Sequence, residues 1–237
     1  MGTLLEIAAN SFQSCIAAQQ GGADRIELFE NLPEGGCTPS YGMLKTVREK
    51  ITIPVYVMIR PRGGDFLYTD AEFEIMQHDA EQCRQLGFSG VVFGMLNAQG
   101  DVDADRCKQL LQVCGDMKAT FHRAFDRAKD LQVSARQLID LGFDRILTSG
   151  GEPDVDKGKD VIKKLQQQFG DHIIIMPGCG VSPANAKTIV DYCGVREIHA
   201  TAKEKTVSHM QYRKDHFADD RNESNLQHIQ ALKAVLL

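Results

Sequence analysis

Short apolar runs alternate with longer amphipathic stretches along the whole chain. The runs are rich in Val, Ile, Leu and Phe and bounded by Gly, Pro, Asn or Asp, a pattern typical of buried strands. Helical patterns such as residues 71–86 and 134–141 lie between them, so the sequence predicts repeated strand–helix units. The predicted strands are residues 4–8, 25–29, 55–59, 91–96, 119–122, 145–148, 173–176 and 197–200.

Such units either close into a barrel or form an open sheet. Eight units in 237 residues predict a single (β/α)8 barrel of the TIM type over residues 1–237. The alternative is an open doubly wound sheet, but no GxGxxG turn follows the first strand. The segments GGADRIELF, LGFDRILTSGG and CGVREIHATA each place a glycine and a basic residue before a strand, at strands 2, 6 and 8. Because even-numbered strands share interior layers, this echo favours the barrel, although helix C-caps also favour glycine.

The C-terminal part of the chain breaks this pattern. Residues 203–221 are polar and irregular, and they follow strand 8, so they begin at the face where barrel active sites lie. We expect a variable surface loop there, with a lid or an oligomer contact as the alternatives. Residues 224–236 predict a last helix that packs back on the barrel.

Composition excludes several classes of protein. The net charge is −5 and no basic run is present, so nucleic acid is a poor partner. No apolar stretch approaches the roughly 20 residues that cross a bilayer, and the N-terminus lacks the basic region of a secretory signal. The seven cysteines are scattered and form no CxxC pair, which predicts reduced thiols in the cytoplasm.

Charged side chains fall at inward positions of several predicted strands. Strand side chains alternate, so Glu6 and Glu27 point into the barrel if their apolar neighbours face the helices. Buried carboxylates are costly unless paired, so they indicate either an ion network with arginines or acids, bases and metal ligands. His122 at the end of strand 5, and Glu197 and His199 on strand 8, share these inward positions. We therefore predict Glu6, Glu27, His122, Glu197 and His199 as catalytic residues.

A second set of residues predicts an anion-binding rim. The stretch MIRPRGGDFLY, residues 58–68, ends a strand with two arginines and a glycine pair, and guanidinium groups bind carboxylate and phosphate. Arg60 is expected near Glu27, so it could instead serve only to neutralise the glutamates. The strand ends LTSGG and MPGCG offer backbone N–H groups to an anion, although turns also need glycine. The predicted anion-binding residues are Arg60, Arg62, Ser149, Gly150, Gly178 and Gly180.

The same motifs carry a family resemblance. GGADRIEL, EGGCTPS, MIRPRGGDFLY, TFHRAFD, RILTSGG and IMPGCGV, in this order over about residues 4–201, resemble the CutC family of copper homeostasis proteins. The resemblance implies a TIM-type barrel, a cytoplasmic location, a homo-oligomer (dimer or tetramer) and a role in copper handling. It also implies copper-binding cysteines in the segments that match LEIAANS and RIELFEN, where this chain has Ala8 and Phe29.

This departure leaves more than one function open. Cu(I) prefers thiolate and thioether ligands, and the thiols predicted at the barrel mouth are Cys37 and Cys179, the candidate metal ligands of a copper-binding protein. The alternative is a barrel enzyme that acts on a small anionic or phosphorylated metabolite by acid–base chemistry. A third possibility is a sensor that binds a metabolite without turning it over. The expected partner is a copper ion or a small anionic molecule, and the sequence identifies neither substrate nor reaction.

Overall fold

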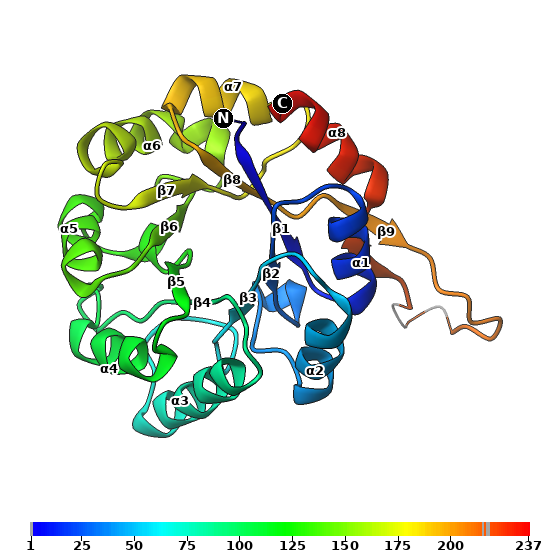
Figure 1. The fold of residues 1–237 in the computed structure, drawn as a ribbon, viewed down its shortest axis with the longest axis horizontal. Helices are drawn as coiled ribbons and strands as arrows, with labels where there is room; N and C mark the ends of the chain where they lie inside the picture. The colour runs from blue at the N-terminus through cyan, green and yellow to red at the C-terminus, as the bar shows by residue number, and fades with distance from the viewer. Residues whose placement is uncertain (1, 215, 217–218) are drawn as a thin grey trace.

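Eight parallel strands form a barrel in the computed structural model, which describes residues 2–214, 216 and 219–237 (Figure 1). Hydrogen-bonded ladders join them in the order β7-β6-β5-β4-β3-β2-β1-β8, and β7 and β8 meet where the ring closes. The predicted (β/α)8 barrel is confirmed, with strand ends displaced by only a few residues. The strands are β1 Leu4–Ala9, β2 Arg25–Leu28, β3 Val55–Met58, β4 Gly90–Phe93, β5 Lys118–Phe121, β6 Arg145–Thr148, β7 Ile174–Pro177 and β8 Glu197–Ala200.

Helices surround the strands, and most begin at a side chain that caps the first turn. Ser11, Ser40, Thr69 and Asp103 each accept a backbone N–H bond there, and Thr69 forms a reciprocal capping box with Glu72. None of the helices in the described part of the chain combines the length and apolar character that a membrane span requires. They are α1 Phe12–Gln20, α2 Tyr41–Lys50, α3 Asp70–Gln85, α4 Ala104–Cys114, α5 Leu131–Leu141, α6 Val155–Phe169, α7 Ala186–Cys193 and α8 Leu226–Leu236, with 3-10 turns at Leu32–Glu34 and Phe125–Arg127.

Strand alternation separates two hydrophobic clusters. The larger one lies between strands and helices, and it includes Leu5, Ile7 and Ile26. The smaller one lies among the inward-facing side chains and consists of Ala8, Phe29, Tyr56, Met58 and Val92. Other inward positions carry ionisable side chains, and each of these is buried: Glu6, Arg25, Glu27, Arg60, His122, Arg145, Glu197 and His199. The polar interior that alternation predicted is therefore present.

The segment after β8 differs from the irregular loop that its composition predicted. Lys203–Thr206 (β9) pairs antiparallel with Arg221–Ser224 (β10), and the two form an arm that projects from the barrel (Figure 1). Both strands are polar on both faces, so no apolar alternation marks them in the sequence. Residues 215, 217 and 218 of the predicted segment lie outside the described residues. Because Ser224 belongs to β10 and Asn225 caps the helix, α8 begins at Leu226 rather than at residue 224.

Candidate functional site

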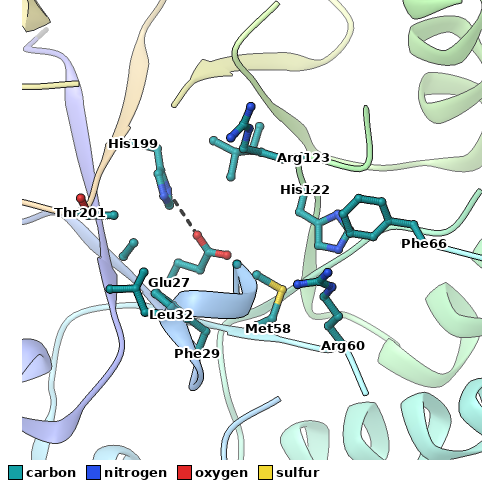
Figure 2. Close-up of a pocket in the computed structure, with 13 residues that line it drawn as sticks. Glu27, Phe29, Leu32, Met58, Arg60, Phe66, His122, Arg123, His199 and Thr201 are labelled. Carbon is teal, nitrogen blue, oxygen red and sulfur yellow. Dashed lines mark ion pairs between the residues drawn. The ribbon is translucent and has the colours of Figure 1, made fainter. Parts of the chain in front are cut away.

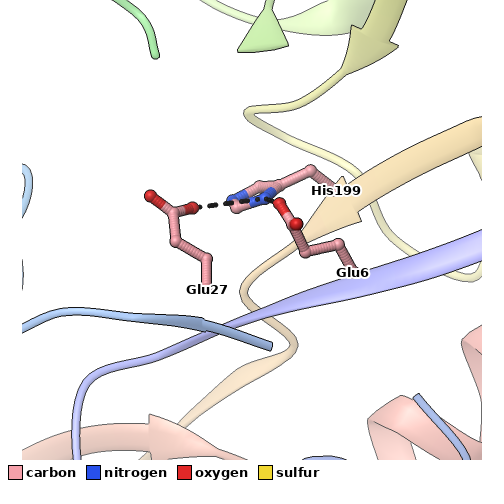
Figure 3. A group of neighbouring side chains, drawn as sticks. All are labelled: Glu6, Glu27 and His199. Atoms are coloured by element: carbon pink, nitrogen blue, oxygen red, sulfur yellow. Dashed lines mark hydrogen bonds and ion pairs between the residues drawn. The ribbon is translucent and has the colours of Figure 1, made fainter. Parts of the chain in front are cut away.

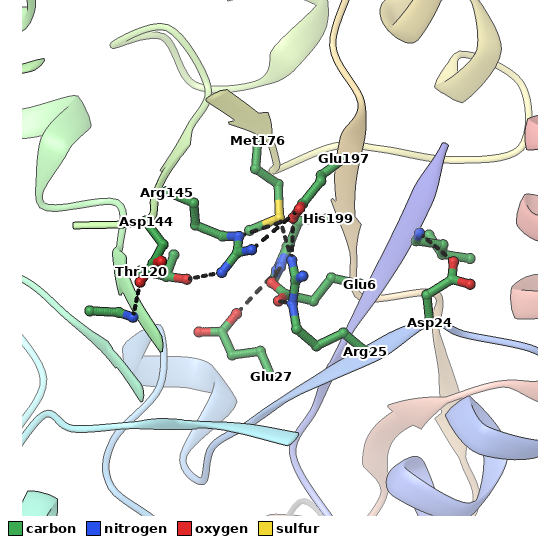
Figure 4. A network of polar contacts seen from close by, with 12 residues as sticks. Glu6, Asp24, Arg25, Glu27, Thr120, Asp144, Arg145, Met176, Glu197 and His199 are labelled. Atoms are coloured by element: carbon green, nitrogen blue, oxygen red, sulfur yellow. Dashed lines mark hydrogen bonds and ion pairs between the residues drawn. The ribbon is translucent and has the colours of Figure 1, made fainter. Parts of the chain in front are cut away.

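A closed ion network fills the barrel interior toward the amino ends of the strands (Figure 4). Arg25 on β2 donates to Glu6 on β1 and, at 2.5 Å, to Glu197 on β8. Arg145 on β6 donates to the same Glu197 at 3.0 and 3.2 Å. The ring of Tyr56 contacts both guanidinium groups, with its centroid 4.9 Å from Arg25 and 5.1 Å from Arg145. Each charge therefore has a partner, as burial requires.

Arg25 and Arg145 were missed as site residues, although the sequence carried a signal for both. Each is the basic residue that opens its strand in the repeated glycine-basic pattern, and Arg25 stands two residues before Glu27 on the same face. These arginines, rather than Arg60, pair with the buried glutamates. The third basic residue of the pattern, Arg196, is exposed, because β8 directs Glu197 inward instead.

Glu6 also belongs to a second group, closer to the barrel mouth. In this group the carboxyl groups of Glu6 and Glu27 approach one imidazole nitrogen of His199 (Figure 3). Nδ1 of His199 lies 2.8 Å from Oε1 of Glu6 and 3.4 Å from Oε2 of Glu27. The neighbouring strands β8, β1 and β2 supply the three residues, and the ladder places Glu6 directly beside His199. The structure thus brings together three of the five predicted catalytic residues, while Glu197 belongs to the network below them.

The pKa values of the two carboxyl groups diverge because only Glu6 is bonded to an arginine. Burial would raise the pKa of Glu6, but Arg25 and His199 together lower it to about 2. Burial raises the pKa of Glu27 to about 7; the charge of Glu6 adds to this shift, whereas His199 and Arg25 oppose it. Burial lowers the pKa of His199, but Glu27 and Glu6 raise it above its ordinary value overall. Glu27 and His199 therefore hold a proton that can be exchanged near neutral pH.

A cavity of about 140 Å³ opens at the barrel mouth between Glu27 and His122 (Figure 2). The Nδ1 atom of His122 accepts the backbone N–H of Ala124 at 3.2 Å, so the neutral ring carries its proton on Nε2. Burial and the nearby Arg60 lower the pKa of His122 to about 3, which keeps the ring neutral. Nε2 of His122, Nε of Arg60 and the hydroxyl of Tyr68 are buried without a hydrogen-bond partner among the described residues, and the Tyr68 hydroxyl lies near the Arg60 guanidinium. Two unmet donors therefore lie in residues of the cavity wall.

The surrounding residues fix the His122 ring in this position. The ring of Phe66 packs against it at a centroid distance of 4.8 Å. A Cβ atom at Gly94 would lie 2.7 Å from Nδ1 of His122, so only glycine fits beside the ring. Apolar side chains complete the cavity wall, among them Phe29, Leu32, Met58 and Leu147. The unmet donors therefore belong to residues that line a small space with a largely apolar wall.

The two arginines predicted to hold an anion have different surroundings. Arg60 is buried and lines the cavity, and its guanidinium donates to the carbonyls of Glu34, Gly36 and Gly64. These bonds join the loops after β2 and β3, so Arg60 also has a structural task. Arg62 lies outside the cavity and forms ion pairs with Asp65 at 3.0 Å and Glu72 at 2.5 Å.

The glycine-rich strand ends have partners inside the protein. Asp126 accepts the backbone N–H groups of Ser149 and Gly151 at 3.0 Å, so an internal carboxylate takes the position expected for an external anion. The N–H of Gly150 bonds to Thr148 Oγ1, and the N–H of Gly178 bonds to the Thr148 carbonyl. The N–H of Gly180 has no such bond to any residue that the structure describes, and Gly180 lines a separate cavity. Ser149, Gly150 and Gly178 therefore have local structural roles in this structure.

The two candidate copper ligands do not join a cluster of soft ligands. Sγ of Cys37 accepts a bond from Asn31, and Sγ of Cys179 donates to the carbonyl of Pro153 at 3.1 Å. The group of metal-ligating side chains found among the described residues is instead Glu6, Glu27 and His199, with ligand atoms within 4.8 Å of one another. Its oxygen and nitrogen donors do not suit Cu(I).

The charges of the interior are nearly balanced around this group. Glu6 is already bonded to Arg25, and the three buried carboxylates face two guanidinium groups and an imidazole. A protonated His199 brings this set to neutrality. A cation that displaced the proton of His199 would meet one net negative charge, so it is the donor type rather than the charge that argues against Cu(I). The residues present do not fit a Cu(I) site.

Comparisons with known proteins agree on one family. The sequence model of the CutC family matches residues 3–204. A family protein CutC from Chromobacterium violaceum is 44% identical, over 100% of this chain and 99% of its own length. The human copper homeostasis protein cutC homolog is 43% identical over 90% of this chain and 78% of its own length. A solved structure named for copper homeostasis, CutC from Streptococcus agalactiae, has a TM-score of 0.80 and 35% identity, covering 84% of this chain and 98% of that one.

Proposed function

The chain belongs to the CutC family, and from this premise we propose that it takes part in copper homeostasis, the process for which its human relative is named. The identity of 43% to that relative supports this assignment. The process does not fix the molecular function, because a shared fold does not by itself supply the chemistry. The molecular function has to rest on the barrel mouth.

The molecular function that this geometry supports best is binding of a small anionic molecule, followed by proton transfer to or from it. The observation that carries this proposal is the pair of unmet donors, His122 Nε2 and Arg60 Nε, at a cavity that Glu27 also lines. Unmet buried donors are costly, so a ligand oxygen that accepts from them is stabilised. With a pKa of about 7, Glu27 can act as a base or an acid at neutral pH.

Each residue has a task in this chemistry. An oxygen of the ligand accepts from His122 and Arg60, and these donors stabilise the negative charge that develops when an adjacent C–H group loses its proton. Glu27 takes the proton. His199, which is oriented by its hydrogen bond to Glu6, lies beside Glu27 and supplies positive charge when the carboxyl group of Glu27 is ionised. The apolar wall limits water around the reacting atoms. Isomerisation and aldol-type reactions both begin with this proton transfer.

Exchange of substrate hydrogen with solvent tests the acid–base part of the proposal. The protein is incubated in D₂O with pyruvate, and loss of the methyl signal is followed by proton NMR against a sample without protein. We expect exchange that is abolished by Glu27→Gln and retained by Glu30→Gln, a control just beyond the end of β2. Exchange that survives Glu27→Gln, or no exchange above the protein-free rate, would overturn the role of Glu27 as a base for a small oxo acid.

Direct binding of copper is the second candidate molecular function, and the family name favours it. Reduced, metal-free protein is titrated with Cu(I) against a chromophoric chelator, beside the double variant Cys37→Ala/Cys179→Ala and the control Cys193→Ala. Tight one-to-one binding that only the double variant loses would establish a copper site on these thiols. Binding no tighter than that of the chelator would remove direct Cu(I) binding and leave the small-molecule function.

Cellular location and assembly belong to the proposal as well. All seven cysteines are free thiols, which suits the reducing cytoplasm. The segment between β9 and β10 exposes Val207, Met210 and Tyr212. Apolar side chains of this kind are often covered in subunit contacts. We expect a homo-oligomer in size-exclusion chromatography with light scattering, and a monomer at all concentrations would remove this part of the proposal.

A further inference from the structure

A second cavity of about 710 Å³ adjoins the barrel mouth. It lies among the loops that follow β7 and β8 and the helix α8, which contributes His228 and Leu232. Arg123, His199 and Thr201 line both this cavity and the mouth cavity, and Figure 2 shows these side chains at the edge of the mouth. The two spaces therefore share a wall, and a single elongated molecule could contact both.

The lining of this second cavity is basic in a protein that is acidic overall. The chain has 32 acidic and 27 Lys and Arg residues, yet the cavity is lined by Arg123, Lys203, His199 and His228 and by no Asp or Glu. Lys203 forms no ion pair with any described residue, whereas Lys205, two positions along β9, pairs with Asp220. A cavity that offers positive charge and lacks carboxylates favours an anion.

Backbone groups at the same place add further donors. Within the described part of the chain, the N–H groups of Gly180 and Val181 have no hydrogen-bond acceptor, and both residues line the cavity. Arg123 adds less, because it already forms an ion pair with Asp126 at 2.8 Å and donates to Ser149. Loop N–H groups combined with basic side chains are a common way to hold phosphate or carboxylate oxygens.

Backbone strain is concentrated around this cavity. Among the described residues, only Asn31, Cys179 and Ala202 have positive φ without being glycine, and Cys179 (φ 81°) and Ala202 (φ 46°) both line it. Such conformations are energetically unfavourable and gather at ligand sites. Hydrogen bonds hold them in place, because the carbonyl of Cys179 accepts from Val155 and that of Ala202 accepts from Asn225.

We propose that this second cavity binds the distal anionic group of an elongated ligand whose reacting end lies in the mouth cavity. The ligand class is then a phosphorylated or dicarboxylic metabolite, and the inference rests on the proposed small-molecule function of the mouth. The loops after strands 7 and 8 are a frequent phosphate site in barrels of this architecture, which agrees with the basic lining. Of the glycines predicted to bind an anion, Gly180 belongs to this cavity.

Calorimetric titration with separate probes tests the proposal on the full chain. Inorganic phosphate probes the second cavity, pyruvate probes the mouth, and phosphoglycolate and succinate present two anionic groups on one molecule. We expect Lys203→Ala/His228→Ala to weaken phosphate and phosphoglycolate binding by about tenfold and to change pyruvate binding by less than about twofold. Lys205→Ala is the matched control and leaves all four affinities unchanged. Both substituted side chains are exposed, so the unfolding midpoint should not move.

The outcomes separate the second cavity from the mouth. Phosphate and succinate binding that are both indifferent to the double variant would overturn the proposal, even if pyruvate still binds the mouth. Phosphate binding that depends on Lys203 and His228, with no pyruvate binding at all, would support the cavity and overturn the function proposed for the mouth. Tighter binding of succinate than of phosphoglycolate, with the same dependence, would assign the distal group as a carboxylate.

Discussion

Two polar regions share the barrel interior, and they differ in how completely their groups are paired. Toward the amino ends of the strands, Arg25, Glu6, Glu197 and Arg145 form a closed network of ion pairs. At the mouth, His122 keeps an unmet buried donor at a cavity. Buried charge by itself therefore does not identify a ligand site, whereas an unmet buried group beside an open space does.

The closed network also sets the chemistry of the mouth. Arg25 bonds to Glu6 and not to Glu27, so Glu6 stays ionised while the pKa of Glu27 rises to about 7. His199 lies between the two carboxyl groups and is oriented by the ionised one. The closed network thus leaves the carboxyl group of Glu27, near the mouth, able to exchange a proton at neutral pH.

The largest expected effect comes from breaking the closed network. Arg25→Met leaves Glu6 without its guanidinium partner and Glu197 with Arg145 alone, and we expect it to lower the free energy of unfolding by about 3–5 kcal/mol. Denaturant unfolding followed by circular dichroism measures the loss, and Arg136→Met, at an exposed position of α5, is the control. A loss below about 1 kcal/mol would mean that the network is not the stabilising region we describe.

Glu27→Gln should have the opposite effect on stability. The pKa of Glu27 is raised from 4.5 to about 7, so the folded state binds this proton more tightly, and stability falls as the pH rises from about 4.5 through 7. His199 acts with the same sign because its pKa is also raised. We expect the variant to be more stable than the parent by about 2–3 kcal/mol at pH 8 and by little at pH 4.

Thermal unfolding across this pH range provides the measurement, with Glu30→Gln as the control. Equal shifts of the midpoint at pH 4 and pH 8 would show that Glu27 does not titrate in this window. A lower midpoint at pH 8 would show that the ionised carboxylate stabilises the mouth, and the contrast between the two regions would then fail.

His122→Phe removes an unmet donor while keeping a flat ring of similar size. We expect pyruvate binding to weaken by about 10- to 100-fold, as for loss of a hydrogen bond to a charged group. The free energy of unfolding should fall by about 1–3 kcal/mol, because Phe cannot accept the backbone N–H of Ala124 that Nδ1 of His122 accepts, whereas Nε2 has no partner among the described residues. Calorimetry measures the affinity, with His78→Phe at an exposed position of α3 as the control. Unchanged affinity would mean that His122 is a packing residue.

The smallest expected effect separates the two neighbouring arginines. Arg62→Ala removes half-exposed ion pairs with Asp65 and Glu72 and hydrogen bonds to carbonyls of its own loop, so we expect a loss of about 1 kcal/mol in stability and less than about a twofold change in pyruvate affinity. Arg60→Ala should weaken pyruvate binding strongly and lower the unfolding midpoint, because Arg60 also joins two loops. Equal effects of the two variants on affinity would place the anion at the outer loop instead.

The sequence by itself determined the barrel and the direction of its charged side chains. Both depend on local periodicity: strand residues alternate between faces, so Glu6, Glu27 and His199 had to share the interior once their apolar neighbours faced the helices. The family resemblance followed from ordered motifs of the same kind. The arm of β9 and β10 escaped prediction because polar residues on both faces leave no periodic signal.

The tertiary structure alone decided which of these groups are paired. Arg25 and Glu197 are separated by 172 residues in the chain, and only closure of the barrel between β8 and β1 brings them together. The same holds for Asp126, which fills the loop after β6, and for the unmet nitrogen of His122. Pairing depends on distance between strands that are remote in sequence, whereas the direction of a side chain depends only on its own strand. The pKa values that distinguish Glu27 from Glu6 therefore belong to the fold.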